Sequence, residues 1–314
     1  MPPVHNIGVR LSVIVPVFNE EENLPRLYER LSPVLEGITP DHEIILVDDG
    51  SRDGSWAIIT SLHERDNRVR GLRFSRNFGH HIALTAGLDM AKGDLVAMMD
   101  ADLQDNPEEL PRFIQKINEG YFLVYGIRKA RRDPLFKRIT GKLFWKLINM
   151  LGGVQMPENQ TMLRLMRKEV ADTLRGMRES HRFIHGLMAW TGFPWTTIEV
   201  EHSPRTAGKT KYNLRRMFSL AINAVTSFSV LPLRLSTYFG LGVAFLSVIL
   251  GIAVIVRKFF WGYGVIGYAS MMAVIFFLGG VVLTVLGIMG EYLGKLYTES
   301  LGRPIYIIRE KTDD

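Results

Sequence analysis

The sequence predicts an α/β protein with a mainly parallel, doubly wound sheet, followed by two helices that span a membrane. Three observations predict this arrangement. Short apolar runs alternate with helical segments between residues 11 and 126, which is typical of a parallel sheet. Acidic and turn-forming residues follow several of these runs, where strands would end. Two long uncharged runs then lie in the last part of the 314 residues.

The expected elements of the first part alternate regularly. Strands are predicted at 11–17, 43–47, 69–74, 95–99 and 122–126, and helices at 23–31, 55–64 and 81–91 and from 107 onward. We expect the first helix to end near Leu31, before Pro33, because proline disrupts a helix interior. Pro107 suits the first position of a helix. After Arg128 the pattern loosens, and helices at about 136–150 and 182–191 with short strands near Met162 and Ile198 are expected.

The two uncharged runs predict a membrane hairpin. Residues 235–256 and 259–290 contain no charged side chain, and each run reaches the roughly 20 apolar residues that a spanning helix needs. The start of the second run is aromatic and glycine-rich, so the spans are expected at about 235–256 and 268–290. Two buried helices of a soluble protein are the alternative, which is disfavoured because helices at the surface of a soluble domain keep a polar face.

These patterns divide the chain into four segments. We expect an α/β domain at 1–212, an amphipathic helix lying in the membrane surface at 213–232, two spans within 233–292, and a tail at 293–314. No signal peptide is visible, and only Arg257 and Lys258 are expected in the loop between the spans. Most other basic residues near the spans precede or follow the hairpin, which predicts a cytoplasmic α/β domain and a cytoplasmic tail.

Composition excludes some kinds of site. The chain has no cysteine, which excludes disulfides and thiolate metal sites. Its formal net charge is +6, and nucleic acid is one interpretation of that charge. The basic residues cluster beside a predicted span, however, which favours anionic lipid or a lipid phosphate over nucleic acid as the partner.

Polar residues follow three of the predicted strands. Asp100 and Asp102 come after the fourth strand, one residue apart, so both carboxylates face the same way in an extended segment. Residues 48–51 end the second strand and residues 16–20 end the first. Strand ends of a parallel sheet meet at one edge, which predicts a pocket with hard oxygen ligands for a divalent cation and phosphates. Neither a dinucleotide-type glycine fingerprint nor a phosphate loop is present in the sequence.

At residues 12–21, 44–55, 75–79 and 99–108 the chain resembles the family 2 inverting glycosyltransferases of GT-A fold. These stretches read SVIVPVFNEE, IILVDDGSRDGS, SRNFG and MDADLQDNPE. With the C-terminal hairpin, the resemblance narrows to the polyprenyl-phosphate glycosyltransferases, a group that includes dolichol-phosphate mannose synthase and the bactoprenol glucosyl transferases. It covers nearly the whole chain.

The resemblance implies a nucleotide sugar as donor, polyprenyl phosphate as acceptor, and Mg2+ or Mn2+ as cofactor. Asp100 and Asp102 would lie at the ribose and the metal-bound diphosphate and act in catalysis, with Gln104 beside the metal. A homo-oligomer is left open. The nucleotide sugar would be bound by Pro16, Phe18, Glu20, Asp48, Asp49, Ser75 and Asp100.

The resemblance also suggests the reaction. We expect inverting transfer of one hexose at the cytoplasmic membrane face, with glucose from UDP-glucose favoured because residues 182–190 and the hairpin are most similar to the bactoprenol glucosyl transferases. Mannose from GDP-mannose and a modified arabinose from a UDP donor remain alternatives. A processive polysaccharide synthase is a rival, although its Gln-x-x-Arg-Trp motif is absent. A catalytically impaired, membrane-anchored binding subunit is another.

The acceptor side departs from the family pattern. Many members have an acid before a late strand where this chain has Met162, and Glu158 is the only carboxylate nearby, most simply a surface acid. His181 and His185, four residues apart, lack a third metal ligand and suit a structural role. Five basic side chains are expected to bind the acceptor phosphate: Arg128, Arg131, Arg205, Lys209 and Lys211. Arg128 and Arg131 are also expected to act in catalysis.

Overall fold

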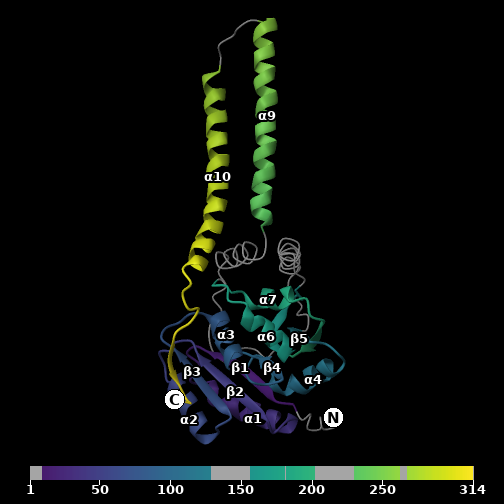
Figure 1. The fold of residues 1–314 in the computed structure, drawn as a ribbon, viewed down its shortest axis with the longest axis vertical. Coiled ribbons are helices and arrows are strands. Elements are labelled where there is room, and N and C mark those ends of the chain that lie inside the picture. Colours follow the sequence, from purple (N-terminus) through teal and green to yellow (C-terminus); the bar gives the residue numbers. More distant parts are fainter. Residues whose placement is uncertain (1–8, 129–155, 181, 202–229, 262–266, 314) are drawn as a thin grey trace. The chain divides into compact units, whose positions relative to one another are not determined.

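The computed structural model describes residues 9–128, 156–180, 182–201, 230–261 and 267–313. These residues fall into two compact units, both visible in Figure 1. The first unit contains the sheet and, besides the residues up to 201, includes residues 303–313. The second contains two long helices. Two expected helices, at 136–150 and 213–229, lie outside the described residues.

The first unit is built on one sheet of eight strands in the order β7-β5-β6-β4-β1-β2-β3-β8. Strand β1 pairs in parallel with β2 and β4, β2 with β3, and β5 with β7. Strand β6 runs antiparallel between β4 and β5, and β8 antiparallel to β3. The strands are β1 (Leu11–Val17), β2 (His42–Asp48), β3 (Val69–Phe74), β4 (Leu95–Met98), β5 (Leu123–Arg128), β6 (Gln160–Arg167), β7 (Trp195–Val200) and β8 (Ile308–Lys311).

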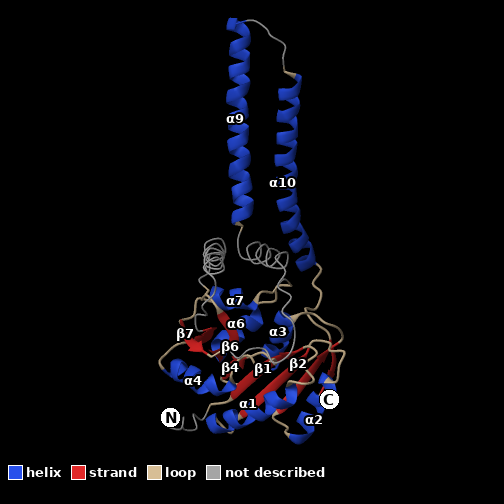
Figure 2. Ribbon diagram, turned by 180° about the vertical axis from the view of Figure 1, so that it is seen from behind, coloured by secondary structure: helices blue, strands red, loops and turns tan. Residues whose placement is uncertain are grey.

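Helices cover both faces of this sheet, as Figure 2 shows. Every residue of β1, β2 and β4 is buried, as expected for central strands of a doubly covered sheet. Successive side chains of β1 point to opposite faces. Val13 and Val15 share an apolar cluster with Leu31 of one helix. Ile14, on the other face, packs so closely on Gly87 of another helix that a Cβ there would lie 2.2 Å from it. The predicted α/β fold is confirmed.

The helices of this unit largely agree with the prediction, but the expected end of the first near Leu31 is wrong. Helix α1 continues through Pro33 to Ile38. Burial of Leu35 and Ile38 beyond the proline contributes about 1.5–3 kcal/mol each, enough to offset the roughly 3 kcal/mol that an interior proline costs. The helices are α1 (Leu24–Ile38), α2 (Ser55–Arg65), α3 (His80–Met90), η1 (Pro107–Glu109), α4 (Leu110–Asn118), α6 (Lys168–Gly176) and α7 (Ile184–Trp190).

The second unit consists of α9 (Leu231–Trp261) and α10 (Tyr268–Ser300). Within them, Leu231–Ala253 and Val274–Ser300 are long and apolar enough to cross a membrane, with mean hydropathies of 2.0 and 2.2. In the most apolar 18-residue stretch of each helix, only 6% and 0% is buried within the protein. Core helices of a soluble protein are mostly buried. Arg257 and Lys258, expected in the connecting loop, lie in the last turns of α9, because these good helix formers let the helix continue past its apolar part.

Residues 303–313, which we call the return segment, fold onto the first unit. Strand β8 pairs with β3, and Thr312 exchanges hydrogen bonds with Gly71, accepting from its N–H at 2.8 Å through the hydroxyl. The ring of Tyr306 stacks on Phe74 with centroids 5.2 Å apart. Its hydroxyl donates to Asp89 at 2.8 Å. A sheet edge that would otherwise be open is therefore covered.

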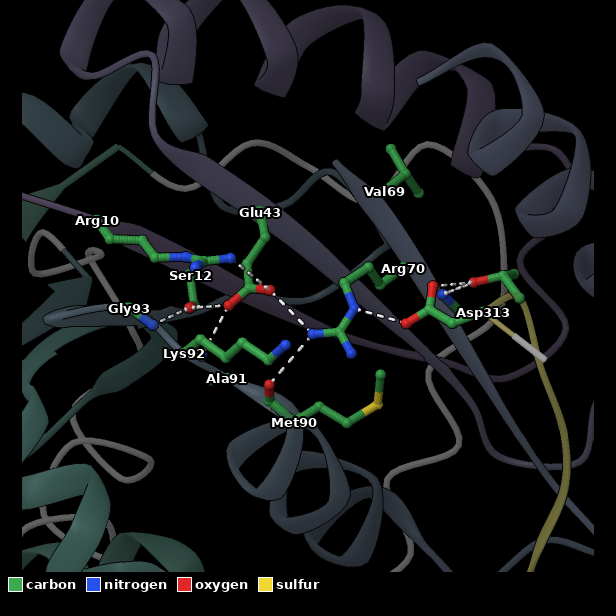
Figure 3. Close-up of polar contacts among 12 residues, drawn as sticks. Arg10, Ser12, Glu43, Val69, Arg70, Met90, Ala91, Lys92, Gly93 and Asp313 are labelled. Atoms are coloured by element: carbon green, nitrogen blue, oxygen red, sulfur yellow. Dashed lines mark hydrogen bonds and ion pairs between the residues drawn. The ribbon is translucent and has the colours of Figure 1, made fainter. Parts of the chain in front are cut away.

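The amino ends of the central strands carry a polar network that reaches this segment (Figure 3). Glu43 of β2 is buried and accepts hydrogen bonds from the Ser12 hydroxyl at 2.6 Å and the Lys92 N–H at 2.7 Å. Arg70 donates to its other oxygen at 3.0 Å and to Asp313 at 2.9 Å. Arg10 lies 3.7 Å from that same Glu43 oxygen. The return segment is thus linked, through Arg70, to a buried carboxylate at the amino end of β2.

Candidate active site

The carboxyl ends of β1, β2 and β4 and the start of α3 surround one pocket. Its volume is about 290 Å³. Gly79 has a φ of 104° before α3, a backbone conformation that glycine adopts at little cost. Five of the residues expected at the nucleotide sugar lie together in this pocket's lining with Asp102, the expected metal-binding acid: Pro16, Phe18, Glu20, Asp49 and Asp100.

The loops after β1 and β2 are tied together by side chains. Asn19 adopts a φ of 57°, and its N–H donates to the Ser51 hydroxyl at 2.9 Å while its side-chain oxygen accepts from the Arg52 N–H at 2.9 Å. The Glu20 N–H donates to Ser55 at 3.0 Å. Phe18, 45% exposed, stands in the pocket wall on this braced loop. An aromatic face held there suits stacking against a nucleobase.

The two aspartates after β2 have different surroundings. Asp48 is fully buried, accepts from the Ser51 N–H at 2.8 Å and pairs with Arg73 at 3.2 Å. It holds the turn. Asp49 lines the pocket and accepts from the N–H groups of Phe78 at 2.6 Å and Gly79 at 2.9 Å. Burial raises the pKa of Asp49 despite these hydrogen bonds. The side chain therefore joins the end of β2 to the start of α3.

Asp100 and Asp102 form the acidic side of the pocket. Burial, followed by the nearby charges of Asp102 and Asp105, raises the pKa of Asp100 to about 7. Leu103 takes a φ of 59°, and the turn places the Gln104 N–H 3.1 Å from an Asp102 oxygen. Asp105 is buried and accepts from the Leu163 N–H of β6 at 2.8 Å. Negative charge is thus concentrated at the end of β4.

This donor set fits a divalent cation. Among the described residues no group of three or more His, Cys, Asp and Glu side chains is placed to hold a metal ion. Magnesium, however, is commonly held by one or two carboxylates together with substrate phosphates. Asp102 supplies such a carboxylate, and a cation beside it would offset the repulsion that raises the Asp100 pKa.

A buried arginine lies behind the acids. Arg164 of β6 is completely buried, and its guanidinium donates to the carbonyl oxygens of Thr161 at 2.8 Å and Met162 at 3.2 Å. It also bonds His185 Nδ1 and lies over the ring of Tyr125 at 5.6 Å. Because guanidinium only donates, that histidine nitrogen accepts and the imidazole is neutral. Burial and the Arg164 charge hold the pKa of His185 well below its usual value.

His80 lines the pocket as well, although its sequence pattern predicted no site role. Its Nε2 lies 3.8 Å from an Asp100 oxygen, and its side chain lines the pocket at the start of α3. Burial and the Arg164 charge lower the His80 pKa. His81, the residue after His80, contacts His185, with ring centroids 5.3 Å apart. The sequence feature that points to this histidine cluster is Arg164, an arginine inside an apolar strand, because a buried guanidinium needs polar partners.

Other expected site residues lie elsewhere. Ser75 follows β3, where its N–H donates to the Ile307 carbonyl at 3.0 Å. Arg128 is exposed at the end of β5, and its N–H donates to Asn159 at 2.9 Å. Glu158 is exposed in a turn, as a surface acid would be. The remaining candidates for the acceptor phosphate lie outside the described residues: Arg131, Arg205, Lys209 and Lys211.

Comparisons with known proteins identify the family to which the chain is similar. The profile of the family described as Glycosyl transferase family 2 matches residues 12–175. A bactoprenol glucosyl transferase of Shigella phage SfX is 40% identical over 96% of this chain and 100% of its own. An uncharacterized glycosyltransferase of Synechocystis is 39% identical over 96% and 95% of the two chains.

Among solved structures, a glucosyl-3-phosphoglycerate synthase of Mycobacterium tuberculosis is similar. The crystal structure of that enzyme is described as a complex with Mn2+, UDP-glucose and phosphoglyceric acid. It is 19% identical, with a TM-score of 0.47 over 70% of this chain and 79% of that one.

Proposed function

The chain belongs to glycosyltransferase family 2, and we propose that it transfers a single hexose, glucose from UDP-glucose, to polyprenyl phosphate with inversion. The observation that carries the proposal is the pocket in which Asp100 and Asp102 meet the loops after β1 and β2, in a chain with two apolar helices. The relatives named bactoprenol glucosyl transferase, alike over nearly their full length, support both the lipid acceptor and the choice of glucose.

Donor binding is assigned to the β1 and β2 loops. Phe18 would stack on the base, while the carboxylates of Glu20 and Asp49, both in the pocket lining, would accept hydrogen bonds from the nucleoside. Asp100 would orient the ribose or the sugar. Because these loops are braced by Asn19 and Ser51, the donor would meet a preorganised site, which lowers the entropy cost of positioning it.

The proposed cofactor is Mg2+ or Mn2+, held by Asp102 and Gln104 together with the donor phosphates. When bound, it would neutralise the negative charge that develops on the departing nucleoside diphosphate. The chain contributes the fixed carboxylate, and the Asp102 oxygen is oriented by the Gln104 N–H.

The acceptor needs little activation. A phosphate monoester has a second pKa of roughly 6 and is mostly dianionic at neutral pH. Its oxygen would attack the anomeric carbon from the side opposite the diphosphate, forming a glycosyl phosphate and releasing UDP. A strong general base is then unnecessary, which is compatible with Met162 at the position where many family members have an acid. The protein's larger task is to hold the two substrates in line.

Membrane attachment through α9 and α10 would bring the site to its lipid substrate. The two helices lie between segments of one folded unit, since β8 pairs with β3. If both helices cross the bilayer, the segments on either side of them emerge on the same face. The basic residues near those segments, such as Arg234, Lys295 and Arg303, favour the cytoplasmic face.

A donor panel tests the proposal. Purified protein is incubated with undecaprenyl phosphate, Mg2+ and, separately, UDP-glucose, GDP-mannose and a UDP-linked modified arabinose, and the lipid product is identified by mass. We expect a hexosyl phosphate lipid from UDP-glucose alone. A product from another donor would reassign the sugar. Nucleotide binding with no lipid product from any donor would instead identify a membrane-anchored binding subunit.

A further inference from the structure

Two polar side chains face each other in the candidate active-site pocket without a hydrogen bond between them. His80, at the start of α3, and Asp100, after β4, both line this pocket. The His80 Nε2 lies 3.8 Å from an Asp100 oxygen, which is too long for a hydrogen bond. The two side chains are 42% and 32% exposed, and neither forms a hydrogen bond with another residue that the structure describes. Both can therefore still bind a ligand.

The position of the His80 ring is constrained by its neighbours. Gly79, directly before it, has a φ of 104° and donates its N–H to Asp49 at 2.9 Å. The ring of His80 packs against that of His81, with centroids 5.7 Å apart and planes at 75°. His81 is packed in turn by Phe183, with ring centroids 5.5 Å apart. A side chain held in this way loses little conformational freedom when it binds a ligand, so its position can select the ligand.

The hydrogen-bonding capacities of the two side chains define the ligand group that fits between them. Burial and the Arg164 charge lower the His80 pKa, so the ring is neutral at neutral pH and carries one N–H. Nε2 carries this hydrogen in the favoured tautomer, because its lone pair would otherwise face a carboxylate oxygen. A donor and an acceptor 3.8 Å apart match a hydroxyl group. Its oxygen can lie about 2.8 Å from both atoms, accepting from His80 and donating to Asp100.

Other ligand groups fit this gap less well. A phosphate oxygen would accept from His80 but would be repelled by Asp100, and an ammonium group offers the His80 N–H no acceptor. In a nucleotide sugar, the ribose and the hexose carry the hydroxyl groups. The hexose is favoured, because the loops after β1 and β2 are assigned to the nucleoside. His80, in contrast, is packed through His81 against His185, which bonds Arg164 of β6, on the other side of β4 from β1.

We propose that the His80 N–H and the Asp100 carboxylate together bind one hydroxyl group of the transferred hexose, which makes His80 a residue that determines sugar specificity. The inference rests on the proposed function, because it takes a hexose as the transferred group. An epimer that directs the same hydroxyl elsewhere would leave the His80 donor and the Asp100 acceptor unpaired. A site built to bind a hydroxyl rejects such ligands strongly, so His80 distinguishes hexoses that are linked to the same nucleotide.

The test measures donor binding by the full-length protein in detergent micelles with Mg2+. Calorimetry compares UDP-glucose with analogues that each lack one hydroxyl group of the glucose or of the ribose. We expect wild-type protein to bind one glucose-modified analogue about 30-fold or more weakly, since two hydrogen bonds are lost, one of them to a charged group. In His80→Phe, which keeps a ring but lacks the N–H, this penalty should fall by about threefold or more. His80→Gln, which keeps an N–H donor, should restore part of it.

The matched control is His81→Phe. It makes the same replacement at the next residue of α3, which is not part of the pocket lining, and should change the penalty by less than about twofold. An equal fall in this control, a penalty that His80→Phe leaves unchanged, or a fall confined to the ribose-modified analogues would each overturn the inference. If His80→Phe misfolds, His80→Ala is measured in the same way, since it also lacks the N–H.

Parallel samples with undecaprenyl phosphate separate this inference from the proposed function. Lipid product is identified by mass in each of them. A hexose penalty that depends on His80, without lipid product, would support the inference and overturn the proposed transfer. Lipid product without such a penalty would support the transfer and overturn the inference. If wild-type protein binds no UDP-glucose, both are overturned.

Discussion

The buried carboxylate of Glu43 and the partly exposed carboxylate of Asp100 lie at opposite ends of the parallel strands and have opposite electrostatic surroundings. Glu43, at the amino edge, accepts hydrogen bonds from Ser12, Lys92 and Arg70 (Figure 3). Burial alone would raise its pKa, but these hydrogen bonds outweigh burial and the Glu43 pKa lies below its usual value. Asp100, at the carboxyl edge, lies among other acids, and its pKa is raised to about 7.

The difference separates a carboxylate that holds the fold from one that is available to a ligand. Around Glu43 the protein itself supplies every donor, so the charge is compensated in the folded chain. Around Asp100 the compensation is incomplete, because Arg164 acts from behind while Asp102 and Asp105 add negative charge. Strongly perturbed acids in a pocket are typical of functional sites. Substitutions at the two edges should therefore have opposite consequences for stability and activity.

The largest effect is expected from Asp102→Asn. Loss of the proposed metal-binding carboxylate should reduce kcat/KM for lipid glycosylation by about 100-fold or more, since charge stabilisation by a bound metal is worth several kcal/mol. The apparent Tm should stay equal or rise, because repulsion of Asp100 is relieved. Radiolabelled sugar transfer and a thermal melt of the same sample measure both. Full activity in this variant would contradict the assignment of the donor site.

Glu43→Gln should instead lower stability and leave activity nearly unchanged. Replacing the buried acid leaves Arg70 without its inner partner and should lower the free energy of unfolding by roughly 3 kcal/mol. The kcat of the folded fraction should change little. Fluorescence-detected urea unfolding gives the first quantity. Glu36→Gln is the control, since this carboxylate is 54% exposed and pairs with Arg68 at the surface, where a pair is worth about 1 kcal/mol or less.

A pH series sharpens the same contrast. The folded-state pKa of Glu43 is lowered, so the unfolded chain binds the proton more tightly than the folded one. Its contribution to stability is fully present above the unfolded pKa of about 4.3 and is lost as the pH falls through the folded value. Wild-type protein should therefore lose stability below about pH 4.3 more steeply than Glu43→Gln. Parallel stability curves for the two proteins would show that Glu43 is not compensated as described.

The smallest effect is expected where the network reaches the return segment. Asp313 is 39% exposed and bonds Arg70, so Asp313→Asn should cost about 0.5 kcal/mol. The loss should be local: amide hydrogens of β8 should exchange faster while those of β1 do not. Asp41→Asn, also an exposed partner in this region, should leave β8 exchange unchanged.

Much of the fold could be predicted from local sequence. Strands β1 and β3 were predicted with their observed limits, and β2, β4 and β5 within a few residues, because buried strands read as continuous apolar runs. Strand β8 could not be predicted, since its four residues include three charged ones and its partner lies far away in the sequence. Tertiary burial also carried α1 through Pro33, against local propensity.

The candidate site was predicted in part. Strand-end acids are visible as a pattern, and the structure brings six of the expected residues into one pocket. His80 and the Arg164–His185 contact were missed, because a histidine after a glycine and an arginine in a strand gain their meaning only from neighbours on other elements.

The pairing of β8 with β3 has a consequence for the order of biosynthesis. Strand β3 leaves the ribosome long before β8, and both apolar helices are made between them. Until the return segment is synthesised, the β3 edge of the nascent domain offers unpaired backbone groups to other chains. Chains interrupted after α10 should therefore be prone to aggregation, and folding of the sheet would be completed only after the helices have left the exit tunnel.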